Sequence, residues 1–180
     1  MGRRRALAQV VTTLILLVVS ILLSGVAVYY SVNILSARLQ TEDLRLNKEH
    51  VWVNGTGAVA ALKITNLGGR DILIDKIEAR GVEAQWSTVY YYRVPTGTTI
   101  DGDLNVTSYD NLAGTSATID GVTYLQASSD LPLISGGELL VYIKGPDSIA
   151  VDDIGTTVSL SVHTGLSQYI TECNVESATP

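Results

Sequence analysis

Cysteine is nearly absent from this chain, because Cys173 is the only one among 180 residues. A lone cysteine excludes an intrachain disulfide. In the last predicted strand, Cys173 shares its alternation parity with Tyr169, Thr171 and Val175. We expect a buried structural cysteine there, with an intermolecular bridge as the alternative.

Histidine is also scarce. His50 and His163 are the only two, and neither stands at a metal-ligand spacing from other His, Cys or carboxylate residues. The Gly-x-Ser-x-Gly motif of a nucleophilic serine is missing. The pair Asp101/Asp103 opens no EF-hand loop, since the central glycine and the terminal glutamate are lacking. We therefore expect no metal ion, no cofactor and no enzymatic activity.

Positive charge is limited to 12 Lys and Arg residues against 18 Asp and Glu. Removing the three arginines Arg3, Arg4 and Arg5 would leave nine basic against 18 acidic residues, a net charge of −9. The remaining basic residues are scattered, whereas nucleic-acid binding needs a clustered basic face. We expect no nucleic-acid partner, and a solvated acidic exterior.

What the chain does have is an uncharged stretch from Leu7 to Ala37 behind those arginines. Its first 26 residues, Leu7 to Val32, would span roughly 39 Å as a helix, more than a bilayer requires. Because Lys and Arg prefer the cytoplasmic side, the rest of the chain is expected outside the cell. A cleaved secretory signal would need Ser24–Ala27 as its small-residue site, and cleavage there would discard the helix.

The sequence Arg5-Ala6-Leu7-Ala8-Gln9, with a basic and a small residue directly before the apolar helix, resembles the prepilin-peptidase site of archaeal type IV pilins and archaellins. The resemblance covers roughly the first 40 residues closely. It implies cleavage between Ala6 and Leu7, so that residues 1–6 form a removable leader. Bacterial type IV pilins usually carry a glutamate five residues into the mature chain, where this chain has Val11. The glycine-rich start typical of many archaellins is also missing.

The resemblance implies a helix that anchors in the membrane first and later packs against its own copies in a filament core. Such a helix has to be apolar on all sides, and Leu14 to Leu23 fits, with only Ser20 interrupting. Small residues would let the helices approach closely. The residues expected in these contacts are Leu14, Leu17, Ile21, Ser24 and Gly25. The helix is predicted from residue 7 to 41, running directly into a first strand.

Residues 42–180 are long enough for one domain with a real core, and they contain no internal repeat or low-complexity linker. Short alternating segments separated by turn signals predict about eight strands. The fold class is therefore α+β: a long hydrophobic helix followed by an antiparallel immunoglobulin-like β-sandwich. The predicted strands are His50–Val53, Val59–Thr65, Asp71–Ile77, Trp86–Val94, Val122–Gln126, Glu138–Lys144, Thr157–His163 and Gln168–Asn174, with a start of strand behaviour at 42–46.

Alternation also assigns faces within these strands. Val158, Leu160 and Val162 are predicted to face inward, as are Leu139, Val141 and Ile143 in the Glu138–Lys144 strand. In Tyr90–Tyr92 the middle ring points opposite to its neighbours, which leaves packing on both faces and one exposed face as open alternatives. The segment from Pro95 to Thr115 is predicted to be a long irregular excursion, available for surface contact.

Two sequons, Asn54-Gly55-Thr56 and Asn105-Val106-Thr107, fall in predicted turns or loops. An exported protein presents glycan acceptors at such places, so Asn54 and Asn105 are predicted N-glycosylation sites.

These features favour a structural subunit of an archaeal type IV pilus-like surface filament, used in adhesion or cell contact. Its expected partners are copies of itself, the prepilin peptidase and assembly machinery, and the membrane before assembly. Two alternatives stay open. One is a non-polymerising anchored surface module, of archaellum stator-like or surface-layer-binding type; the other is an archaellin serving motility.

Overall fold

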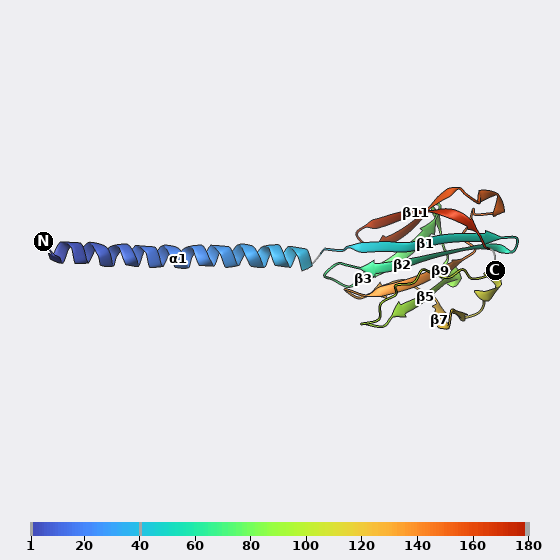
Figure 1. Cartoon of the computed structure of the whole chain (residues 1–180), viewed down its shortest axis with the longest axis horizontal. Helices are drawn as coiled ribbons and strands as arrows, with labels where there is room; N and C mark the ends of the chain where they lie inside the picture. Colours follow the sequence, from blue (N-terminus) through green and yellow to red (C-terminus); the bar gives the residue numbers. More distant parts are fainter. Residues whose placement is uncertain (1, 40, 179–180) are drawn as a thin grey trace. The chain divides into compact units, whose positions relative to one another are not determined.

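The computed structural model describes residues 2–39 and 41–178, and the chain divides into two compact units, residues 1–40 and 41–180. The first unit is one helix, α1 (Gly2–Leu39), drawn in Figure 1. Its start precedes the predicted Leu7, because arginine, alanine and leucine are all good helix formers. The helix was predicted to end near Thr41; α1 ends at Leu39, Thr41 is not helical, and Gln40 lies outside the described residues.

The second unit is a β domain whose described part contains 11 strands. They are β1 (Leu44–Asn54), β2 (Gly57–Asn66), β3 (Ile72–Ala79), β4 (Val82–Glu83), β5 (Val89–Val94), β6 (Ser116–Ile119), β7 (Val122–Gln126), β8 (Leu131–Leu133), β9 (Glu138–Lys144), β10 (Thr157–Thr164) and β11 (Gln168–Ser177). Three 3-10 turns accompany them: η1 (Trp86–Thr88), η2 (Tyr109–Asn111) and η3 (Val151–Asp153).

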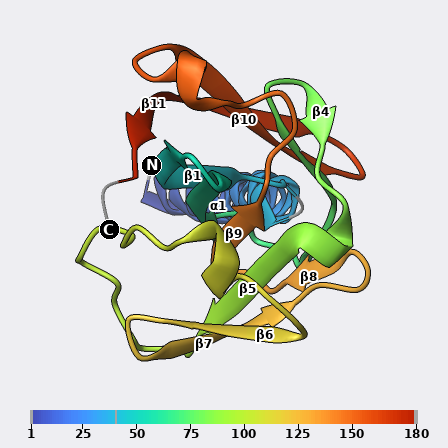
Figure 2. The ribbon, with the colours of Figure 1, turned by 90° about the vertical axis from the view of Figure 1, so that its right-hand side faces the viewer.

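The predicted sandwich is confirmed, and its strands follow one continuous path, β4-β3-β10-β11-β1-β2-β9-β5-β7-β6, with β8 on β3. One departure from an all-antiparallel arrangement occurs between β1 and β11, which pair in parallel with Val51 opposite Val175. This parallel contact joins the layer of β3, β10 and β11 to the layer of β1, β2, β9 and β5. Figure 2 shows β10 and β11 on the opposite side of the domain from β6 and β7.

The predicted strands all have counterparts, but several boundaries differ, and at one of them the predicted strand residues form another element. The segment Trp86–Thr88 forms η1, and strand β5 begins only at Val89. The additional strands β4, β6 and β8 have two to four residues each, too short for alternation to reveal. Two of the tight turns, at Arg80-Gly81 and Asp120-Gly121, have both residues at positive φ, the geometry that a two-residue hairpin prefers.

The main core lies between the two layers. Val158, Leu160 and Val162 are buried in it, as predicted. From β9, Leu139, Val141 and Ile143 join them, and none of the three is accessible to solvent. The alternation of β9 and β10 therefore predicted the inner face correctly.

A second core covers the opposite face of the β1–β2–β9–β5 layer. Leu140 and Tyr142, on the face of β9 that was predicted to be outside the core, are buried in it. The cover is the excursion between β5 and β6, which inserts Leu104 and Leu112. The excursion has no strand within its described residues, as predicted, but it belongs to the packed interior.

The three consecutive tyrosines of β5 pack on both faces of this layer. Tyr90 is buried in the second core, Tyr92 packs against the same core, and Tyr91 packs against the main core. Of the two alternatives left by the sequence, packing on both faces is the one observed.

Candidate functional site

Helix α1 contains a segment, Ala8–Ser36, of 29 residues with a mean hydropathy of 2.6. This is the length and composition of a membrane-spanning helix or of an N-terminal signal sequence. The predicted cleavage residues Ala6 and Leu7 both belong to α1 and immediately precede this segment.

Six polar side chains of the apolar segment bind the helix's own backbone. Thr12 Oγ1 donates to the carbonyl of Ala8 at 2.9 Å, Ser20 Oγ to Leu16 at 2.7 Å, and Ser24 Oγ to Ser20 at 2.8 Å. Thr13, Ser31 and Asn33 make the same kind of hydrogen bond, to the carbonyls of Val10, Ala27 and Tyr29 respectively. Hydroxyls satisfied in this way need no water, so these positions are compatible with a lipid or protein environment.

The residues predicted for helix–helix contact share one side of α1. Their spacing along the chain (3, 4, 3 and 1 residues) keeps them within an arc of about 100°. Leu14, Leu17 and Ile21 are each about 60% exposed, and a Cβ built on Gly25 meets no atom within 4 Å. Leu14, Leu17, Ile21, Ser24 and Gly25 therefore form an open apolar stripe with its smallest residues at one end.

In the β domain, side chains at a bulge in β1 bind the excursion, which is the segment between β5 and β6. The pairing of β1 with β2 shifts between Asn47 and His50, and Lys48 adopts a positive φ of 55°. Such a bulge redirects a side chain. The Lys48 ammonium donates to the carbonyl of Asp101 at 2.9 Å and also to that of Gly102.

His50 adds a second fastening point on the same bulge. Its Nε2 lies 3.0 Å from Asp103 Oδ1, and its Nδ1 lies 3.7 Å from Glu176 Oε2. The hydrogen bond from His50 is the main cause that lowers the pKa of Asp103. The imidazole stacks on Trp52 with ring centroids 4.9 Å apart, so it is fixed from three directions.

Behind His50 an aromatic row runs under the excursion. Trp52 stacks near Tyr142 at 6.4 Å, and Tyr142 meets Tyr124 edge to face at 5.0 Å. Burial raises the pKa of Tyr124 to about 12 and also raises the pKa of Tyr142. Both phenols therefore stay neutral, and the Tyr142 hydroxyl donates to the carbonyl of Asn105 at 2.8 Å.

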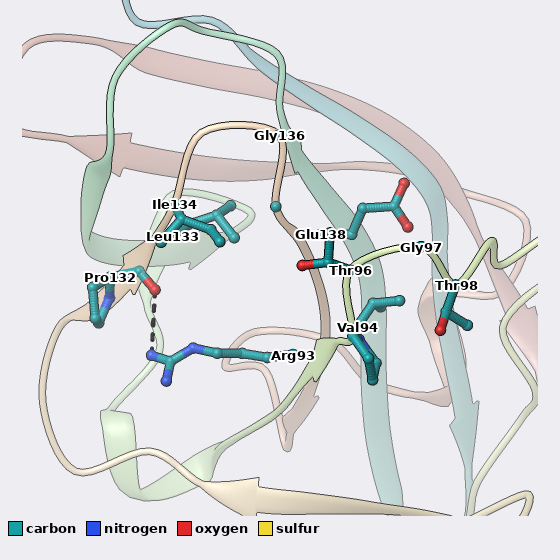
Figure 3. A pocket seen from close by; sticks show the side chains of 12 residues that line it. Arg93, Val94, Thr96, Gly97, Thr98, Pro132, Leu133, Ile134, Gly136 and Glu138 are labelled. Atoms are coloured by element: carbon teal, nitrogen blue, oxygen red, sulfur yellow. Dashed lines mark hydrogen bonds between the residues drawn. The ribbon is translucent and has the colours of Figure 1, made fainter.

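A cavity of about 350 Å³ opens where β5 leaves the sheet, opposite β8 (Figure 3). Arg93 extends across it and donates to the carbonyl of Pro132 at 3.3 Å, while its guanidinium lies 5.2 Å from the Tyr91 ring centre. On the far wall, Glu138 Oε1 lies 2.8 Å from Lys63 Nζ, and Glu138 Oε2 is buried with no hydrogen-bond partner among the described residues. The cavity wall is otherwise formed by Val94, Pro95, Thr96, Gly97, Thr98, Leu133, Ile134, Gly136 and Gly137.

This cavity was not predicted, because Arg93 and Pro132 are 39 residues apart and no local pattern links them. In the sequence, Pro132 is the residue that could have indicated this edge of the sheet. A proline has no N–H for a strand ladder, so it marks an edge strand, and the Arg93 contact covers the carbonyl on that edge. The arrangement therefore occupies one carbonyl on the edge of β8.

The two predicted glycosylation sites lie at different kinds of position. Asn54 ends β1 at the β1–β2 turn, and Asn105 lies in the excursion with its Nδ2 donating to Asp120 Oδ2 at 2.8 Å. Cys173 is free and half-buried in β11, and burial raises the pKa of its thiol to about 11. The thiol is therefore neutral and weakly reactive at neutral pH.

Within residues 2–39 and 41–178, no group of three or more His, Cys, Asp or Glu side chains is arranged to hold a metal ion. His50 and the acidic residues near it hold the excursion in place. Among the described residues, they do not form a metal-binding group.

Comparison with known proteins assigns neither a family nor a function to this chain. No protein-family model and no curated protein matches the chain. Among solved structures, the ligand-binding region of serine-glutamate repeat protein A from Enterococcus faecium is similar at 13% identity and a TM-score of 0.34, covering 78% of this chain and all of that one. A likeness this weak supports no conclusion about function.

Proposed function

We propose that the chain is a structural subunit of an archaeal type IV pilus-like surface filament. Helix α1 polymerises as the filament core after serving as a membrane anchor. The β domain forms the outer sheath and serves adhesion or cell contact.

The observation that carries the proposal is the open apolar surface of the segment Ala8–Ser36. Large apolar side chains on all sides of it are 44–68% exposed. A single helix cannot shield these side chains itself, so water has to be excluded by lipid or by other chains. Neighbouring copies of the same helix provide such cover in a filament, and the lipid bilayer provides it before assembly.

The position of the basic residues supports the same order of events. Arg3, Arg4 and Arg5 precede the apolar segment, which orients the helix with its start at the cytoplasmic side. A prepilin peptidase on that side would cut between Ala6 and Leu7. The mature helix then has no charged side chain before Arg38, so its side chains can move from lipid into a protein core without burying a charge.

The β domain has properties that suit an exterior sheath. Its basic residues are largely engaged within the domain, for example Arg80 with Asp153 at 2.9 Å and Arg70 with Glu42 at 3.4 Å. The acidic residues outnumber them, which leaves a solvated negative surface. The excursion is pinned at several points, so the sheath presents a fixed shape to the outside.

The test is to shear the cells that produce the chain and to determine the N terminus of the released protein by mass spectrometry. We expect filaments in the sheared fraction whose subunit begins at Leu7. A chain that keeps its arginine leader and stays in the membrane pellet would refute the proposal and support the non-polymerising anchored module. Filaments that rotate in intact, swimming cells would instead assign the subunit to an archaellum.

A further inference from the structure

The two sequons of the β domain use their side chains in opposite ways. At Asn54 every hydrogen bond of the side chain is made by the carbonyl oxygen. Oδ1 accepts from the backbone N–H of Thr56 at 2.9 Å, from Thr56 Oγ1 at 2.6 Å and from the N–H of Gly57 at 3.1 Å. The amide nitrogen, Nδ2, donates to no group within the described residues, so it is the free atom of this side chain.

The turn that carries Asn54 is held in a fixed position. Gly57, which pairs with Asn54 across the hairpin, packs so closely on Tyr109 that a Cβ there would lie 2.5 Å from the ring. Lys144 Nζ lies 4.5 Å from the centre of the same ring. Gly55, at the tip, has no atom within 4 Å of an added Cβ. The hairpin is therefore firm at its base and open at its tip.

A shallow hollow of about 100 Å³ adjoins Asn54. It is lined by Asn54, Val106, Thr107, Ser108 and Ala178. Val106 is 41% exposed there. The C–H face of a sugar ring attached to Asn54 would cover this valine and remove its apolar surface from water.

The second sequon is hydrogen-bonded to the rest of the domain, although Asn105 itself is exposed. Asn105 Nδ2 already donates to Asp120 Oδ2 at 2.8 Å, and the Asn105 carbonyl accepts from Tyr142. The Thr107 hydroxyl accepts from Asn111 Nδ2 at 2.9 Å, and Thr107 is only 7% exposed. While the domain is folded, the Asn105 nitrogen donates one hydrogen bond and the Thr107 hydroxyl is buried, whereas Thr56 of the first sequon is exposed.

We propose that Asn54 is the acceptor of an Asn-linked saccharide, that Asn105 stays unmodified, and that transfer takes place on the folded domain. The donor is a saccharide linked to a lipid phosphate or diphosphate. Asn54 Nδ2 forms a C–N bond to the anomeric carbon, and the C–O bond to the phosphate breaks. The lipid phosphate leaves with the bonding electrons, and Nδ2 gives up one proton to a base of the transferase.

This inference goes beyond the filament proposal. It requires that the β domain is exported, and it holds equally for a chain that never polymerises. Its failure therefore leaves the filament proposal standing, and a failed filament assay leaves this inference intact.

The experiment is to express the full chain, with its own leader, in a host that glycosylates exported proteins at Asn-x-Ser/Thr sequons. A second exported protein with an occupied sequon is expressed alongside as a positive control. Mass spectrometry then measures the occupancy of the peptides that contain Asn54 and Asn105. We expect a saccharide on most of the Asn54 peptide and on less than about a tenth of the Asn105 peptide.

Variants separate loss of the acceptor from loss of the fold. Asn54→Asp keeps an oxygen that can accept the three hydrogen bonds and replaces the amide nitrogen by a second carboxylate oxygen, so we expect a folded and unglycosylated chain. Asn105→Ser should leave the intact mass of the glycosylated chain unchanged apart from the substitution. Modification of Asn105 at a level equal to Asn54 would overturn the selection by the folded domain. An unmodified Asn54 beside a glycosylated control protein would overturn the site itself.

Discussion

His50 holds Asp103 across a gap of 53 residues, with Nε2 3.0 Å from Oδ1, and so ties the long excursion to the bulge of β1. The Lys48 ammonium binds the two carbonyls just before Asp103. The fastening of the excursion therefore depends on a charged side chain, and its strength should depend on pH.

Acidification should weaken this fastening. The hydrogen bond from His50 lowers the pKa of Asp103 below its ordinary value of 3.8. A carboxyl with a lowered folded pKa stabilises the fold above its unfolded pKa, and this stability is lost as pH falls through the folded pKa. We expect Asp103→Asn to lower the free energy of unfolding at pH 7 by about 0.5 kcal/mol, a small value because the carboxylate is largely exposed. Urea unfolding of the full chain in detergent, followed by tryptophan fluorescence, measures it.

The control is Asp101→Asn, since the Asp101 side chain makes no hydrogen bond or ion pair within the described residues. This variant should match the wild type at every pH. An Asp103→Asn variant whose stability differs from the wild type by the same amount at pH 7 and at pH 2 would show that the carboxylate charge is not involved.

The turn at the end of β1 offers a test of close packing. A Cβ on Gly57 would stand 2.5 Å from Tyr109 Cδ2, so Gly57→Ala has to displace the ring and its contact with Lys144. Overpacking of this kind costs about 1–3 kcal/mol. Gly55→Ala, two residues away, adds the same methyl group in open space and should change stability by less than about 0.5 kcal/mol. Thermal unfolding of both variants decides; equal midpoints would mean that Tyr109 does not brace the turn.

The excursion should behave as part of the core. Leu112 is fully buried in the second core, so Leu112→Ala leaves a cavity and should lower the free energy of unfolding by about 2–5 kcal/mol. Leu166→Ala removes the same atoms from a residue that is 69% exposed, in the β10–β11 turn, and should have little effect. Denaturant unfolding compares the two. A loss below about 1 kcal/mol for Leu112→Ala would mean that the excursion only rests on the surface.

This burial marks the limit of what alternation in the sequence can predict. The strands β7 and β9 were predicted to the residue, because each is a short run with strand-forming residues between clear turn signals. Leu104 and Leu112 stand alone among glycines, aspartates and threonines, and an isolated apolar residue has no period. The second core exists only because β9 is covered on both faces, and that is a property of the fold, which local sequence does not encode.

The candidate sites also have one part that the sequence predicts and one part that depends on tertiary contacts. The sequons Asn54 and Asn105 could be read from three residues each, but their different hydrogen bonding depends on Asp120, Asn111 and the turn of Gly57. The cavity at Arg93 depends on a contact over 39 residues and left no trace in the sequence except Pro132. Motifs in the sequence therefore located the candidate acceptors, and only the tertiary contacts distinguish them.

Polymerisation should be more sensitive than membrane insertion to the size of residue 25. Gly25 lies on the stripe with Leu14, Leu17 and Ile21, and a Cβ added there meets no atom within 4 Å. Gly25→Ile raises the hydropathy of the segment, so the helix should insert in the membrane as before, while close helix approach is blocked. We expect the amount of subunit in the sheared filament fraction to fall at least tenfold. Ala27→Ile, about 200° around the helix from Gly25, adds similar bulk away from the stripe and should reduce it less. Undiminished filaments with Gly25→Ile would mean that this stripe is not the close contact of the core, whereas membrane levels that fall together with filament levels would point to a loss of insertion.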